Sequence, residues 1–327
     1  MTSRPPSSTS PRKPAAQPGL PKPATGERGT TRRPARQAEN GQPGGKRQAG
    51  PGKPGRLEPA PVWSEELWRL LDGSHHDPHS VLGAHPRQDG VAVRVLRPYA
   101  QKVTVVTEGM RAELVHQSDG MFTGLLPARK VPDYHLVVTY DGTDYELHDP
   151  YRFLPTIGEF DLHLIGEGRH ERLWEVLGAH VMEVGGITGT RFAVWAPNAQ
   201  GVRLAGDFNL WDGTCLPMRS LGASGVWELF VPGLGPGTLY KFEVIGRDGS
   251  RRLKADPMAR AAETPPATAS VVTASDYRWQ DDEWMARRGD RPVHRAPFSV
   301  YEVHLPSWRP VLGYRELAEQ LPAYLRD

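Results

Sequence analysis

From Val91 onward, apolar side chains recur at every second position, which is the period of a β-strand with one buried face. Turn-forming residues separate the segments that have this pattern, which span Val91–Leu96, Val103–Val106, Met121–Leu126 and His135–Tyr140. The pattern predicts a small all-β domain in the first half of the chain.

Two other segments have the apolar spacing of a helix. Trp63–Leu71 places Trp63, Leu67, Leu70 and Leu71 on one face; Ser64 is its expected N-cap, and Gly73 its expected end. Near the C-terminus, Tyr314–Leu325 has the same kind of face, with Pro322 inside it as an expected kink.

The chain repeats itself. The segment Arg97–Val103 recurs as Ala196–Val202, and a tyrosine, an Asp-Gly pair and an Asp-Pro pair follow each copy in the same order: Tyr134, Asp141-Gly142 and Asp149-Pro150, then Tyr240, Asp248-Gly249 and Asp256-Pro257. An Asp-Gly pair between alternating segments is typical of a short hairpin. The repeat therefore predicts two copies of one sandwich, each of the size of an immunoglobulin-like unit. A connector at Gly166–Leu177 is expected to contain a short helix that ends at Gly178.

Composition divides the chain further, into residues 1–61, 62–165, 166–280 and 281–327. The first range is rich in Pro, Gly, Lys and Arg and has almost no aliphatic residues, so we expect a disordered basic tail that acts as a solubilising extension. The alternative is weak binding of the tail to polyanions, which high salt would abolish. Since the net charge of +2 and the pI of 8.6 depend on this tail, they indicate no specific nucleic-acid site.

Several classes of protein are disfavoured. The single cysteine, Cys215, excludes a disulfide framework within the chain and is expected to be a reduced thiol. No apolar run approaches the roughly 18–20 residues of a membrane helix, and the N-terminus lacks the apolar core of a signal peptide. These features predict a cytoplasmic protein without a membrane partner.

The second copy contains an insertion, Gly206–Gly213, that the first copy lacks. Phe208 and Trp211 are costly to expose, and flat rings cover the apolar C–H faces of sugars. Asn209 and Asp212 could exchange hydrogen bonds with sugar hydroxyls. We therefore predict that these four residues contact a glycan, and the alternative is that both rings plug the loop against the sandwich core.

Other chemistry-bearing residues favour structural roles. Trp195 and Trp227 fall in predicted strands and are expected in the core. A cluster of histidines suggests zinc, but its spacing fits no standard finger and no cysteine accompanies it, so we expect no metal; its members are His75, His76, His79 and His85. Glu302 and His304, on one face of a predicted strand, are expected to be structural rather than catalytic.

Together these motifs resemble the bacterial glycogen branching enzymes, the 1,4-α-glucan branching enzymes of the α-amylase superfamily (glycoside hydrolase family 13). The resemblance runs from about Trp63 to Asp327, and its strongest segments are Asp77–Pro86, Phe192–Gly213, Asp256-Pro257, Val300–Pro310 and Tyr314–Leu321. It implies a mainly β chain with two tandem immunoglobulin-like sandwiches, the second a carbohydrate-binding module, followed by the first strand and helix of an incomplete (β/α)8 barrel. Tyr301–Leu305 would be that strand, although Pro306 replaces the family's usual glycine.

The resemblance also implies an activity: retaining transfer of an α-1,4-glucan segment to a 6-hydroxyl in glycogen biosynthesis, with no cofactor and no metal. The nucleophile and the acid/base would lie beyond Asp327, so no catalytic residue is assigned, and Tyr301 is the one residue matched to the family's sugar site. The literal chain is thus expected to bind α-glucan without turning it over. The alternatives are a stand-alone α-glucan-binding protein and an inert truncated product.

Overall fold

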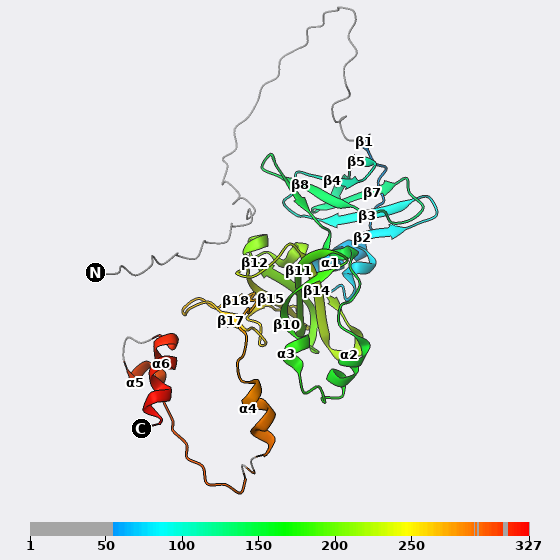
Figure 1. The fold of residues 1–327 in the computed structure, drawn as a ribbon. Coiled ribbons are helices and arrows are strands. Elements are labelled where there is room, and N and C mark those ends of the chain that lie inside the picture. Colours follow the sequence, from blue (N-terminus) through cyan, green and yellow to red (C-terminus); the bar gives the residue numbers. More distant parts are fainter. Residues whose placement is uncertain (1–54, 291, 293, 310–312, 327) are drawn as a thin grey trace, which may run out of the picture. The chain divides into compact units, whose positions relative to one another are not determined.

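A computed structural model describes residues 55–290, 292, 294–309 and 313–326 (Figure 1). The chain forms two compact units, which divide between Ala274 and Ser275. The predicted tail lies outside the described residues up to position 54. Its last part is a correction, because residues 55–61 join the first sandwich: β1 (Gly55–Arg56) pairs with β5 (Met110–Glu113), and the Arg94 side chain donates to the Ala60 carbonyl. The flanking Pro and Gly residues hide this edge strand in the sequence.

The first sandwich consists of two sheets that enclose a valine-rich core. One sheet has the order β1-β5-β4-β8-β9, with β4 at Lys102–Thr107, β8 at His135–Tyr140 and β9 at Thr143–Leu147. The other has the order β2-β3-β7-β6, with β2 at Gly83–Pro86, β3 at Val91–Leu96, β7 at Met121–Leu126 and β6 at Val115–Ser118. The strands predicted from the period of two are thus confirmed.

The second sandwich repeats this plan. One sheet has the order β10-β11-β14-β13, with β10 at Gly178–Val184, β11 at Ile187–Trp195, β14 at Val226–Pro232 and β13 at Arg219–Ser220. In the other, β12 (Ala199–Gly206) pairs with β15 (Leu239–Gly246), which also pairs with β16 (Arg251–Lys254) and β18 (Ser270–Val271); β17 (Ala261–Ala262) pairs with β18. Both copies therefore share one topology, and the prediction of tandem immunoglobulin-like sandwiches is confirmed.

The repeat extends to a single buried hydrogen bond. The Tyr134 hydroxyl donates to the Asp149 carboxylate at 2.9 Å, and the Tyr240 hydroxyl donates to the Asp256 carboxylate at 2.5 Å. In each copy the second carboxylate oxygen accepts a backbone N–H two residues further on. Each copy thus fastens the end of its hairpin to the same place on its sheet.

Short helices occupy the joints between the sandwiches. Helix α1 (Ser64–Asp72) ends at Gly73 as predicted, but Trp63 is 82% exposed and therefore does not belong to the buried face. The Arg203 guanidinium on β12 donates to the Leu70 and Leu71 carbonyls, so α1 packs against the second sandwich. In the connector, the observed helices are α2 (Glu159–Gly166) and α3 (Leu173–Val176).

The C-terminal unit contains no strand among its described residues, so the predicted barrel strand is wrong for this structure. The segment around Tyr301 is irregular, and α5 (Leu305–Trp308) begins where the strand was expected to end. A lone parallel strand has no neighbour for its N–H and C=O groups, so it gains nothing by extending. The helix predicted at Tyr314–Leu325 is confirmed as α6 (Tyr314–Tyr324), and α4 spans Asp282–Arg287. In neither unit does a described helix combine the length and apolarity that crossing a membrane requires.

Candidate functional site

The inserted loop of the second sandwich stands where the first sandwich has β5. After β12 the chain makes a single turn at Asp207–Asn209, and Leu210 and Trp211 then both adopt positive φ angles, 57° and 63°. Two successive left-handed residues other than glycine are costly and persist only where the surroundings hold them. Here the Trp211 N–H donates to the Gly206 carbonyl at 2.9 Å, which closes the loop.

Asn209 is one of the groups that hold the loop. Its side chain is 4% exposed; its Oδ1 accepts from the Gly206 N–H and its Nδ2 donates to the Leu204 carbonyl, both at 2.9 Å. The prediction that Asn209 contacts a sugar therefore does not fit its position. Phe208 is half-buried against the core, and its ring lies close to Gly206. These two residues thus shape the loop from within.

Trp211 has the opposite environment. Its side chain is 37% exposed, and the Lys241 ammonium lies 5.9 Å from the centre of its ring. Lys241 is on β15, where it pairs with Ala205 at the end of β12, and it also donates to the Thr268 hydroxyl at 2.7 Å. The sequence analysis missed Lys241, because only the pairing of β12 with β15 brings this lysine beside a loop so distant in sequence.

Asp212 is tied from two directions. Its Oδ1 accepts from the Thr214 N–H at 2.9 Å, and its Oδ2 accepts from the Tyr99 hydroxyl of the first sandwich at 2.7 Å. Burial alone would raise the pKa of the Asp212 carboxyl, but the hydrogen bonds from Thr214 and Tyr99 outweigh it and lower the pKa below its ordinary value. A charged carboxylate therefore lies directly after the exposed ring of Trp211.

Tyr301 lies in the other unit. It is 46% exposed, its hydroxyl accepts from the Trp308 indole N–H at 3.0 Å, and its ring lies 5.6 Å from that of Tyr324. The role of Tyr301 at a sugar site stays a prediction.

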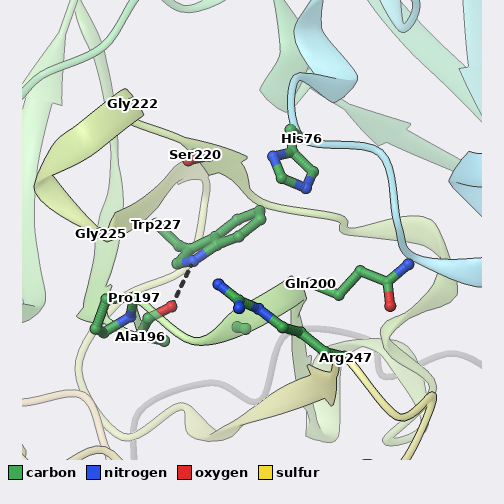
Figure 2. A pocket seen from close by; sticks show the side chains of 10 residues that line it. His76, Ala196, Pro197, Gln200, Ser220, Gly222, Gly225, Trp227 and Arg247 are labelled. Atoms are coloured by element: carbon green, nitrogen blue, oxygen red, sulfur yellow. Dashed lines mark hydrogen bonds between the residues drawn. The ribbon is translucent and has the colours of Figure 1, made fainter.

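A second hollow, of about 260 Å³, lies at the other end of β12 and β15 (Figure 2). Trp227 forms part of its wall; this indole is 3% exposed, donates to the Ala196 carbonyl at 3.1 Å and meets the ring of His76 edge-on at 5.6 Å. Gln200 and Arg247 extend along the opposite side. Trp227 is thus a core residue as predicted, whereas Trp195 is 55% exposed, contrary to prediction.

The four neighbouring histidines have separate surroundings. His75 accepts from the Asp77 N–H, His76 contacts Trp227, His79 meets the ring of Tyr151, and the His85 ring nitrogen bonds the Leu82 carbonyl. In the described part of the chain, no group of three or more candidate ligands could hold a metal ion.

The fold and the exposed aromatic loop fit a class of sugar-binding sandwich. Residues 176–259 match the family model "Carbohydrate-binding module 48 (Isoamylase N-terminal domain)". Residues 63–151 match "alpha-1,4-glucan branching enzyme GlgB, N-terminal domain". The second sandwich is accordingly a carbohydrate-binding module, and the first is the domain that precedes it in branching enzymes.

Relatives in the curated proteins agree with these matches. The chain is 64% identical over 282 residues to the 1,4-alpha-glucan branching enzyme GlgB of Kitasatospora aureofaciens, an alignment that covers 86% of this chain and 37% of that protein. It is 67% identical over 259 residues to GlgB 1 of Streptomyces avermitilis, with 79% and 31% covered. The two sandwiches are those of the N-terminal part of glycogen branching enzymes, and the chain spans 31–37% of the length of these two relatives. A solved pullulanase from Anoxybacillus sp. LM18-11 aligns with 59% of this chain and 26% of its own at 18% identity, with a TM-score of 0.27, which is too low to support an argument.

Proposed function

We propose that this chain is the glucan-holding part of a 1,4-α-glucan branching enzyme, and that the loop around Trp211 binds an α-glucan chain. The observation that carries the proposal is an exposed indole on a tightly held loop, with an ammonium and a carboxylate beside it. Trp211 covers the C–H face of a glucose unit, while Lys241 and Asp212 lie where they can bond its hydroxyls. Because the loop is fixed before the glucan arrives, little ordering entropy is lost on binding.

Binding of this kind would serve a transfer reaction. In the proposed whole enzyme, a carboxylate attacks the anomeric carbon of an α-1,4 linkage, a carboxylic acid protonates the leaving oxygen, and a 6-hydroxyl of another chain accepts the glucan. The sandwiches keep a long, flexible substrate close to that chemistry without taking part in it. The chain's own contribution is thus local concentration and orientation of glucan.

Replacement of the exposed indole tests the proposal. We expect Trp211→Ala to weaken glycogen retention in native affinity gels by about tenfold, which is about 1.4 kcal/mol. Trp174→Ala on α3, where the indole is 55% exposed, is the matched control and should leave retention unchanged. If the Trp211 variant stays folded by circular dichroism and retains glycogen as the parent does, the loop is not the binding site.

A further inference from the structure

The segment that follows Trp211 is held by the first sandwich. Tyr99, in the turn between β3 and β4, donates to Asp212, and the Arg97 guanidinium donates to the Cys215 carbonyl at 3.4 Å. The Tyr151 hydroxyl donates to the Pro217 carbonyl at 3.1 Å. Three side chains of one sandwich therefore grip the last part of the other sandwich's candidate binding loop.

Tyr99 is the member of this group that touches the loop beside its exposed ring. Burial does not explain a tyrosine here, since Tyr99 is 57% exposed; its counterpart in the second copy of the repeat is Asn198. Its hydroxyl holds one oxygen of Asp212, and the other oxygen holds the Thr214 N–H. This carboxylate is the residue after Trp211, so the bond from Tyr99 restrains the backbone that carries the indole.

We propose that the first sandwich positions the glucan-binding loop of the second, and that Tyr99 is the positioning residue. The inference rests on the proposed function, because it gives Tyr99 a role only if Trp211 binds glucan. Without the hydroxyl, Asp212 loses a charge-assisted hydrogen bond and the two left-handed residues before it gain freedom. The loop must then be ordered at the moment of binding, which lowers affinity without removing any sugar contact.

Tyr99→Phe in the full chain tests this step. We expect glycogen affinity to fall about two- to tenfold, while the melting temperature stays within about two degrees of the parent because the lost bond is exposed. Amide exchange at Thr214 should become faster, since its N–H depends on the carboxylate that Tyr99 holds. The matched control is Tyr145→Phe on β9 of the same sandwich, whose half-buried hydroxyl makes no hydrogen bond to another described residue; it should change neither value.

A double variant separates positioning from any other effect. In the Asp212→Ala background, Tyr99→Phe should produce no further loss of affinity, because the two residues act through one bond. An additional loss of the same size would overturn the proposal, as would unchanged affinity and Thr214 exchange in the single variant. If Trp211→Ala weakens binding while Tyr99→Phe does not, the positioning role fails and the proposed function stands; if neither weakens it, both fail.

Discussion

His79 is an imidazole enclosed between the two sandwiches. Neither ring nitrogen has a hydrogen-bond partner, and the ring packs edge-on against Tyr151 at 5.0 Å. Burial lowers the pKa of His79 from 6.5 to about 3, and the positive charges of Arg219 and His85 act in the same direction. The folded protein therefore keeps this side chain neutral over most of the acidic range.

This histidine predicts acid sensitivity. Because the pKa of His79 is lower in the folded than in the unfolded state, stability is fully present above about pH 6.5 and is lost as pH falls from there toward 3. Between pH 7 and pH 4.5, the loss from this group should be about 2–3 kcal/mol. We expect His79→Phe to remove that part of the pH dependence in urea unfolding followed at both pH values.

The matched control for acid sensitivity is His163→Phe, at an exposed position of α2. It should leave the difference in unfolding free energy between the two pH values as in the parent. Equal pH dependence in the His79 variant and the parent would show that other groups cause the acid sensitivity.

Among the structural elements, the contact between α1 and β12 is unusually close. A side chain on Gly201 would place its Cβ 1.7 Å from the carbonyl oxygen of Gly73, the residue that ends α1. Gly201→Ala should therefore force the helix away from the sheet and lower the free energy of unfolding by about 1–3 kcal/mol. Gly235→Ala, where the added Cβ meets nothing within 4 Å, should have little effect on thermal unfolding. Equal melting temperatures of the two variants would contradict this account of the joint.

The elements also show where a sequence suffices and where it does not. Strands such as β3 follow from a local period of two, and the paired Tyr–Asp bonds follow from a repeat visible in the letters. Lys241 and the exposure of Trp195 depend on which strands become neighbours and on which face stays uncovered, and neither is local information. The expected strand at Tyr301 failed for the same reason, since a barrel strand exists only beside other barrel strands.

At the scale of the whole molecule, the buried core belongs to the first unit. All three hydrophobic clusters lie between Val62 and Val272, whereas Leu317 is the one buried residue among the described positions of the C-terminal unit. Acidic residues there, such as Asp282 and Glu302, are exposed to solvent. Retaining transfer needs two carboxyl groups held about 5–5.5 Å apart in a shaped site, one of them with a raised pKa. An exposed carboxylate in an unpacked segment meets neither condition.

We therefore predict that this chain alone binds glycogen but does not branch it. Incubation with amylose should leave the iodine colour unchanged over a time in which a full-length relative bleaches it, while native gels still show retention by glycogen. The Trp211→Ala chain serves as the control, because it should fail in the second assay and match the parent in the first. Loss of iodine colour with the parent chain would mean that its own residues form a catalytic site, and a stand-alone enzyme would then replace the glucan-holding module as the interpretation of the molecule.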